Sequence, residues 1–302
     1  MTLWWGTIEG ADLIELIDVA AATGFDGVAV MPAMYFAARE SGVSDAELRS
    51  RLADGGVVVR VIDPLIRALP GSPTPAEAAP RFRPTFQYGE DDCYRVAQAL
   101  AVPVLNVAHY MCAPTPVEQL AEAIGAISER AEAHGVAITL EFLPEGSIPD
   151  IATAASIIDS VGSRNCGLML DTWHLFRTSG TAADVRALPS GVVRAVQLSD
   201  ADEDLWGTGA FPPTRDRLLP GSGVIPLVDI LRAALTNCPD AVIGAEIFSR
   251  VLAREAPLER ARRTRAALDA LFAEAARGGL EPLVDAPARQ TAGDDKGSHS
   301  TR

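Results

Sequence analysis

The feature of this sequence that most constrains its fold is a regular alternation of short β-branched segments with longer amphipathic segments over positions 1–280. Most of the short segments are apolar at consecutive positions. This indicates strands that are buried on both faces, as in a parallel sheet covered by helices. Eight such strands are predicted: Leu3–Gly6, Gly27–Met31, Val57–Asp63, Val104–Ala108, Ala137–Phe142, Cys166–Asp171, Val193–Ser199 and Ala241–Ile247.

Segments with helical periodicity separate the strands. They are Asp12–Ala22, Ser44–Ala53, Glu90–Leu100, Pro116–His134, Asp150–Val161, Ala182–Ala187, Leu227–Leu235 and Pro257–Ala276. The sequences Ser44-Asp45-Ala46-Glu47 and Thr115-Pro116-Val117-Glu118 both have the pattern of a capping box. The second also has proline at the first helical position, so both patterns predict a helix start.

Eight strands alternating with eight helices in about 280 residues predict an α/β protein with one (β/α)₈ TIM-barrel domain over residues 1–279. A doubly wound sheet is the competing arrangement. No GxGxxG motif follows the first strand, so the dinucleotide-binding form of that sheet has no support. From Gly278 onward the composition changes to Pro, Ala, Gly, Asp and Ser, and we expect residues 280–302 to form a disordered tail.

Charge and composition argue against several classes of partner. The net charge of −14 would repel a phosphate backbone, which disfavours a nucleic-acid partner. No apolar run reaches the roughly 18 residues that a membrane span needs, and the N-terminal residues lack the pattern of a signal peptide. The four cysteines are widely spaced without a CxxC motif, which is typical of reduced thiols in a cytoplasmic protein.

The basic residues narrow the possible chemistry further. Of the 26 basic residues 25 are arginine, and the single lysine is Lys296, close to the C-terminal end of the sequence. The predicted barrel therefore has no lysine that could form a Schiff base with a substrate or with pyridoxal phosphate, and no P-loop lysine. Its chemistry must come from carboxylates, histidines, a metal ion or an organic cofactor.

Polar residues stand where several predicted strands end, which is where the active sites of TIM barrels lie. Four consecutive strands carry Glu141, Asp171, Gln197 and Glu246 at their carboxyl ends. Asp63 and His109 end two earlier strands. Packed carboxylates repel one another unless a cation neutralises them or one is protonated. Because oxygen ligands suit Mg²⁺ or Mn²⁺ better than Zn²⁺, we expect the four residues to hold one such divalent ion.

These residues belong to an ordered set of motifs. The set consists of Leu140-Glu141, Leu170-Asp171-Thr172-Trp173-His174, Val196-Gln197-Leu198-Ser199-Asp200, Pro220-Gly221-Ser222-Gly223 and Ala245-Glu246-Ile247-Phe248. Over roughly residues 1 to 275 the chain resembles the xylose isomerase-like barrels of the sugar phosphate isomerase/epimerase group. The resemblance implies one divalent metal bound by the four residues above. Glutamine at position 197 departs from the histidine of most members and matches hydroxypyruvate isomerase-like members.

The same resemblance implies roles for individual side chains. Glu141 and Glu246 are expected to be the acid/base pair, and His174 and Arg217 to contact the substrate. We add His109 as a third candidate substrate-binding residue because it ends a strand. The implied reaction is isomerisation or epimerisation of a keto sugar or a related polyhydroxy carbonyl compound through an enediolate. The metal polarises the carbonyl while one glutamate removes the neighbouring proton.

Several alternatives remain open at this point. A dehydratase or lyase of the inosose, dehydroshikimate or C-glycoside-cleaving type would begin with the same proton abstraction. A multi-zinc apurinic-site endonuclease is disfavoured, because Asp63, Gln197 and Leu218 stand where histidines are expected. A noncatalytic ligand-binding barrel is a third possibility. We also expect a homodimer, and no particular residue predicts it.

Two further segments invite a functional hypothesis. The connection Pro64–Gly89 is long and holds six prolines, and we expect it to cover the mouth of the barrel and to influence substrate choice. Gly221-x-Gly223 resembles a phosphate-binding turn but is too short to carry that assignment alone.

Overall fold

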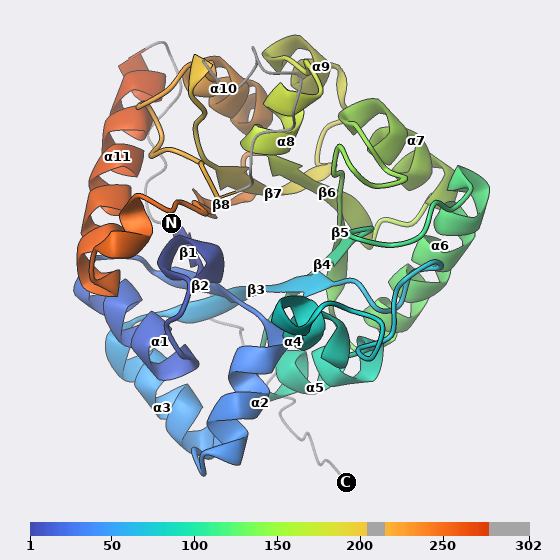
Figure 1. The fold of residues 1–302 in the computed structure, drawn as a ribbon. Helices are drawn as coiled ribbons and strands as arrows, with labels where there is room; N and C mark the ends of the chain where they lie inside the picture. Colours follow the sequence, from blue (N-terminus) through green and yellow to red (C-terminus); the bar gives the residue numbers. More distant parts are fainter. Residues whose placement is uncertain (204–214, 278–302) are drawn as a thin grey trace, which may run out of the picture.

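The computed structural model describes residues 1–203 and 215–277, and it confirms the predicted barrel (Figure 1). Eight parallel strands form a closed ring in which each strand pairs with the next along the chain, and β8 pairs with β1. The strands are β1 (Thr2–Trp4), β2 (Gly27–Val30), β3 (Val58–Leu65), β4 (Val104–Ala108), β5 (Ala137–Glu141), β6 (Cys166–Asp171), β7 (Val193–Leu198) and β8 (Val242–Ala245). The tail predicted at 280–302 lies outside the described residues.

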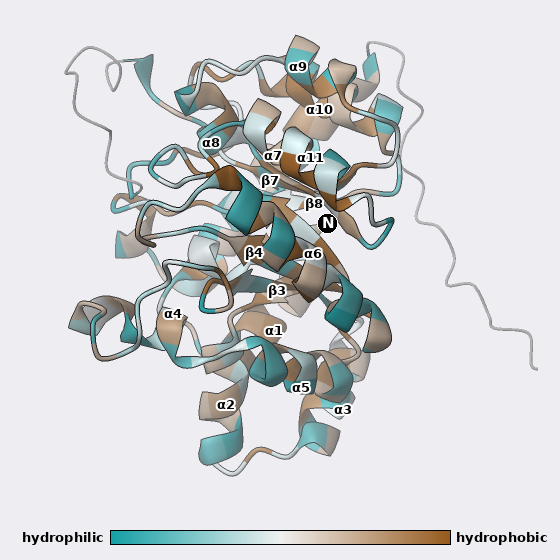
Figure 2. Cartoon of the chain, turned by 90° about the vertical axis from the view of Figure 1, so that its right-hand side faces the viewer, coloured by the Kyte–Doolittle hydropathy of each residue, from teal (hydrophilic) through white to brown (hydrophobic). Residues whose placement is uncertain are grey.

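Helices surround the ring of strands (Figure 1). They are α1 (Leu13–Ala22), α2 (Pro32–Glu40), α3 (Asp45–Gly55), α4 (Arg83–Gln87), α5 (Glu90–Leu100), α6 (Val117–Ala133), α7 (Ile151–Val161), α8 (Thr172–Arg177), α9 (Ala182–Ala187), α10 (Leu227–Asn237) and α11 (Pro257–Arg277). They carry both hydrophobic and hydrophilic residues (Figure 2). Among the described residues, no helix combines the length and the apolar character needed to cross a bilayer.

The two predicted capping boxes have different outcomes. At the start of α3, Ser44 Oγ accepts a hydrogen bond from the Glu47 amide, and the Glu47 carboxylate accepts one from the Ser44 amide, so this capping box is confirmed. The second prediction is wrong. Helix α6 has no side-chain cap, and the Thr115 hydroxyl donates instead to the backbone oxygen of Pro70, 3.2 Å away. A tertiary contact between two loops has replaced the local one.

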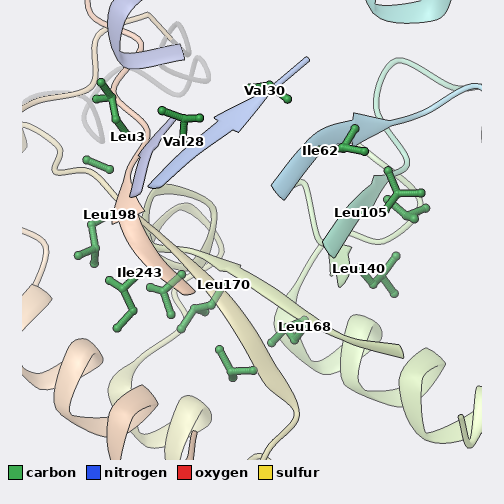
Figure 3. Close-up of a cluster of buried hydrophobic side chains, with 14 of the residues drawn as sticks. Leu3, Val28, Val30, Ile62, Leu105, Leu140, Leu168, Leu170, Leu198 and Ile243 are labelled. Atoms are coloured by element: carbon green, nitrogen blue, oxygen red, sulfur yellow. The ribbon is translucent and has the colours of Figure 1, made fainter. Parts of the chain in front are cut away.

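The outward-facing side chains of the strands form the main hydrophobic core. Ten of them are labelled in Figure 3: Leu3, Val28, Val30, Ile62, Leu105, Leu140, Leu168, Leu170, Leu198 and Ile243. All ten lie buried between the barrel and its helices. Truncating one such leucine to alanine typically costs about 2–5 kcal/mol, so this layer contributes strongly to the stability of the barrel.

The seam between β8 and β1 depends on a glycine. A side chain at Gly244 would place its Cβ 1.8 Å from the backbone oxygen of Thr2 and 2.7 Å from the ring of Trp4. Neither neighbour can move aside, because one is backbone and the other is a buried indole. Only glycine allows the last strand to approach the first closely enough to complete the ring.

The long connection after β3 has a small core of its own. Phe86 of α4 is fully buried in a cluster with Ile66, Ala78, Ala108 and Leu143. Gly71 accepts a 2.8 Å hydrogen bond from the amide of Ala113, which lies beyond β4. The connection is therefore anchored on the loop that follows the neighbouring strand. Its role in covering the site stays a prediction.

Candidate metal centre and active site

The interior of the barrel changes from apolar to polar within two residues along four of its strands. One layer contains Val61, Val104, Met169 and Ala195, which are buried together with Trp4 and Ala29. The residues two positions further along those four strands are Asp63, Asn106, Asp171 and Gln197. Because side chains two apart on a strand face the same side, these four point into the barrel just above the apolar layer. Glu141 ends β5, and Glu246 follows β8 directly.

Two amide side chains organise part of this polar layer. Asn106 Nδ2 donates to Asp63 Oδ1 at 2.7 Å and to Glu141 Oε2 at 2.6 Å, while Thr139 donates to Asn106 Oδ1. Gln197 Nε2 donates to Asp63 Oδ2 at 3.1 Å. These contacts fix which end of each amide is nitrogen. They leave the buried Oε1 atom of Gln197 without a hydrogen-bond partner among the described residues.

Among the described residues, Asp171, Glu141 and His174 form a group of possible metal ligands. One ligand atom from each lies within 4.8 Å of the others. His174 Nε2 is 3.5 Å from both Glu141 Oε1 and Asp171 Oδ2. Asp171 is also the N-cap of α8, because its Oδ1 accepts a 2.7 Å hydrogen bond from the Trp173 amide. The start of this helix therefore fixes both the carboxylate and the imidazole one turn later.

Arg217 supplies a buried positive charge to the cluster. Its Nη1 lies 2.8 Å from Asp171 Oδ2 and 3.5 Å from Glu246 Oε2. The guanidinium carbon also sits 5.6 Å from the ring centre of Trp173 and 5.3 Å from that of Phe248. The Arg217 amide donates to the Phe248 oxygen, so the segment after β7 is tied to the one after β8. Arg217, which the sequence analysis expects in the site, thus lies beside Asp171 and Glu246.

Crowding changes the protonation of these groups. Burial, followed by the nearby charge of Asp63, raises the pKa of both Glu141 and Glu246 well above the ordinary range. Burial and the charge of Asp171 raise the pKa of Asp63 to about 6. Burial also opposes ionisation of Asp171, but Arg217 and then His174 outweigh it and hold that pKa below its usual value. Burial lowers the pKa of His174 to about 4, so its ring is neutral at pH 7.

The residues present fit a divalent cation. Four buried carboxylates face one guanidinium, which leaves negative charge that a cation would neutralise. The unpaired Oε1 of Gln197 is an oxygen ligand in need of a partner. Carboxylate and amide oxygens, with one imidazole beside them, are donors that Mg²⁺ and Mn²⁺ accept.

His109 makes its two hydrogen bonds to loop residues outside this cluster. Its Nε2 is 3.2 Å from the backbone oxygen of Pro70, and its Nδ1 accepts a 3.2 Å hydrogen bond from the Ser147 amide. Both ring nitrogens are thus used to connect the loops that follow β3 and β5. Burial lowers the pKa of His109, which keeps the ring neutral and the two hydrogen bonds in place. These contacts connect two loops, and the substrate-binding role expected of His109 stays a prediction.

Asp63 and Asn106 are the members of the cluster that the sequence reasoning missed. The sequence marks Asp63 only as a strand-end residue, and nothing in the strand-end pattern points to Asn106. The alternation of inward-facing and outward-facing side chains along a strand could have identified both residues. Each stands two residues after an inward-facing valine, Val61 and Val104, in strands that are otherwise apolar.

The Gly221-x-Gly223 turn has an internal partner. The carboxylate of Asp200 accepts hydrogen bonds from the backbone amides of Gly221 at 3.0 Å, Gly223 at 2.9 Å and Ile225 at 2.9 Å. It also accepts one from the amide of Ala201. The amides of this turn therefore bind a side chain of the same protein, and they are not directed at an external phosphate.

Comparison with known proteins identifies the family. Residues 17–273 match the family described as the xylose isomerase-like TIM barrel, and the chain belongs to that family. An inosose isomerase of Halalkalibacterium halodurans is 27% identical over 124 residues, which are 40% of this chain and 43% of the relative. The match thus spans less than half the length of that curated relative.

Two solved structures illustrate how far the likeness extends. An IolI protein with a bound zinc atom superposes with a TM-score of 0.74 at 16% identity, covering 90% of this chain and 98% of the other. A D-psicose 3-epimerase of Clostridium cellulolyticum H10, solved with D-tagatose, gives a TM-score of 0.63 at 20% identity and covers 89% and 97% of the two chains. At these identities the likeness shows a shared fold.

Proposed function

We propose that this protein is a divalent-metal-dependent isomerase or epimerase of a keto sugar or a related small polyhydroxy carbonyl compound. The observation that supports the proposal is the buried polar group at the carboxyl end of the barrel, in which ligand atoms of Glu141, Asp171 and His174 lie within 4.8 Å of one another and Gln197 Oε1 has no hydrogen-bond partner among the described residues. The curated relatives that match part of the chain are inosose isomerases, which supports the same class of reaction.

The ion would be held by Glu141, Asp171, Gln197 and Glu246, with His174 beside them. We favour Mn²⁺ or Mg²⁺ from the excess of oxygen donors. When bound, the ion supplies polarisation of the substrate carbonyl, which acidifies the hydrogen on the adjacent carbon. The protein supplies the groups that remove and return that hydrogen.

Glu141 and Glu246 are the proposed acid/base pair. They come from β5 and β8, which are separated in the ring by β6 and β7, so they approach a substrate from different directions. A carboxylate on one side of a carbon removes its proton, and a carboxylic acid on the other side returns one with inverted configuration. Burial of both groups excludes bulk water from the exchange.

Arg217 and His174 are proposed to orient the substrate. The contacts of Arg217 with Trp173 and Phe248 restrict its motion, so its donors point in a fixed direction. His174 is neutral at pH 7 and can exchange one hydrogen bond with a substrate hydroxyl without adding charge. Fixed partners of this kind reduce the entropy lost when the reacting carbon is brought to a glutamate.

The test is exchange of the substrate α-hydrogen with deuterated solvent, followed by NMR in the Mn²⁺-loaded protein. Glu141→Gln and Glu246→Gln should each slow the exchange by about 10³-fold or more, because each removes a group that transfers the proton. Glu118→Gln, at an exposed position on α6, is the matched control and should exchange at the wild-type rate. Exchange that persists in both site variants would refute the assignment.

Analysis of the product separates the isomerase from a dehydratase. Both reactions begin with removal of the same hydrogen, but a dehydratase then expels a hydroxyl and leaves an enone. An isomerised or epimerised sugar in the NMR spectrum, without enone absorbance, is the expected outcome. Stoichiometric enone formation would instead assign the lyase reaction to the same residues.

A further inference from the structure

The buried side chain of Gln197 has two different ends, and only one of them can bind a cation. Its amide oxygen is a ligand for a divalent ion, whereas its NH₂ group is a hydrogen-bond donor that a cation repels. The two ends have almost the same size, so packing alone cannot choose between them. A hydrogen-bonding neighbour must therefore decide which end faces the carboxylates of the site.

That neighbour is Asp63. Its Oδ2 accepts a 3.1 Å hydrogen bond from Gln197 Nε2, which is the one hydrogen bond of this side chain in the part of the chain that the structure describes. Because the carboxylate is the acceptor, it takes the NH₂ end and leaves Oε1 free. The contact crosses the barrel, since β3 and β7 stand opposite each other in the ring with three strands between them on either side. A residue of the far wall thus sets the orientation of Gln197.

The other oxygen of the same carboxylate acts on Glu141 through Asn106. Asp63 Oδ1 accepts a 2.7 Å hydrogen bond from Asn106 Nδ2, and the same NH₂ group donates to Glu141 Oε2 at 2.6 Å. Thr139 donates to the oxygen end of Asn106 at 3.0 Å, so both ends of this amide are assigned. With Oε2 held in this way, it is Oε1 of Glu141 that faces the ring of His174, 3.5 Å away.

Asp63 is itself held in place. It is only 3% exposed, and its backbone oxygen accepts a 3.1 Å hydrogen bond from Trp5 Nε1. The group of ligand atoms that lie within 4.8 Å of one another comes from Glu141, Asp171 and His174, without Asp63. Each oxygen of Asp63 is instead used by an amide. The position of Asp63 therefore suits a residue that orients ligands rather than one that binds the ion.

We propose that Asp63 is a positioning residue that selects the orientation of two metal ligands, Gln197 directly and Glu141 through Asn106. The inference rests on the proposed function, because it takes the ion to be bound by these residues. Outer partners of metal ligands typically change metal affinity by about 10–100-fold when they are replaced. Asp63 acts on two ligands from opposite sides of the barrel, so its replacement should have an effect of this size.

Asp63→Asn should disturb both ligands. Two NH₂ groups, those of Gln197 and Asn106, point at this position, and an asparagine offers them one acceptor in place of two. One NH₂ group therefore loses its partner and turns away or stays unpaired, which loosens one ligand. We expect the dissociation constant for Mn²⁺, titrated through the electron paramagnetic resonance signal of the free ion, to rise by about 30-fold. Glu118→Gln on α6 is the control and should keep the wild-type value.

Gln197→Glu separates this role from a simple attraction between Asp63 and the ion. In that variant two carboxylates face each other where the hydrogen bond to Asp63 was. Adding Asp63→Asn supplies a donor to the new carboxylate, while its oxygen still accepts from Asn106. We therefore expect Asp63→Asn to raise the Mn²⁺ affinity of Gln197→Glu protein or to leave it within about twofold. A charge that only attracts the ion would instead weaken binding by the same factor in both backgrounds, and that result would overturn the inference.

Folding and reaction are assessed separately from binding. If Asp63→Asn alone does not fold, the comparison of Gln197→Glu with the double variant Asp63→Asn/Gln197→Glu decides: Mn²⁺ affinity that holds or rises supports the inference, and affinity that falls overturns it. If Mn²⁺ binding follows the expected pattern but wild type exchanges no α-hydrogen, the proposed reaction is wrong and the positioning role stands. Failure of wild type to bind Mn²⁺ would overturn the metal centre and this inference with it.

Discussion

The buried carboxylate of Asp200 and the buried carboxylates of Glu141 and Glu246 have opposite surroundings. Asp200 is fully buried and accepts hydrogen bonds from four backbone amides. Glu141 and Glu246 are almost as buried, but they face other carboxylates that raise the pKa of both groups. The protein itself supplies four donors to Asp200, whereas Glu141 and Glu246 lie among like charges that a cation would neutralise. The comparison teaches that burial of an acid points to a functional site when its neighbours are other acids rather than a full set of donors.

Removing the satisfied carboxylate should have the largest effect on stability. Asp200→Asn keeps the size of the side chain but replaces an oxygen acceptor by a donor that faces backbone amides. We expect the free energy of unfolding, measured by urea denaturation, to fall by about 3 kcal/mol, because charged hydrogen bonds are lost and amides are left unpaired. A variant as stable as wild type would mean that Asp200 is not what holds the turn.

The pH dependence of the unfolding free energy tests the raised pKa of Asp63, a carboxylate of the crowded cluster. The pKa of Asp63 is raised from 3.8 to about 6, so in metal-free protein its stabilising contribution is full below pH 4 and is lost as the pH rises through 6. Asp63→Asn removes this dependence. Between pH 4 and pH 7, chelator-treated wild type should therefore lose about 2 kcal/mol of unfolding free energy relative to the variant. Parallel stability curves for the two proteins would contradict the raised pKa.

Substituting a member of the crowded cluster should change stability in the opposite direction from Asp200→Asn. Glu246→Gln removes one like charge from metal-free protein while preserving volume, so we expect unfolding free energy to rise by about 1 kcal/mol. The same variant should lose most of the stabilisation that Mn²⁺ gives to wild type, because one ligand is gone. Thermal unfolding with and without Mn²⁺ measures both effects. A loss of stability without metal would place Glu246 with Asp200 as a structural residue.

The difference between these groups explains what the sequence could predict. The barrel was predictable because most strands are apolar at consecutive positions, a pattern that depends on burial rather than on any particular contact. Glu141, Asp171 and Gln197 were predictable because each interrupts or ends such a strand. That Asp171 also caps α8 was not, because α8 begins directly after β6 and the sequence pattern predicted no helix there.

Other members of the site depend on contacts between distant segments. Asn106 matters because it bridges Asp63 and Glu141, which belong to the strands on either side of it, and only the closed ring shows this. Likewise Arg217 reaches Asp171 and Glu246 because the segments after β7 and β8 pair through the Phe248 oxygen. A single sequence carries no local signal for these contacts, since the residues that make them lie 29 to 46 positions apart.

The two buried histidines repeat the comparison on a smaller scale and give the last prediction. His109 uses both ring nitrogens, whereas His174 has a buried Nδ1 without a partner among the described residues and an Nε2 that faces two carboxylates. His109→Ala should therefore lower unfolding free energy by about 1 kcal/mol and leave kcat within about twofold.

His174→Ala should do the reverse, with a large loss of kcat/KM and little loss of stability. A stable His109→Ala protein with a raised KM would instead return His109 to the substrate-binding role predicted from its strand-end position. In that case the hydrogen bonds to Pro70 and Ser147 would hold the ring for the substrate, rather than hold the two loops together.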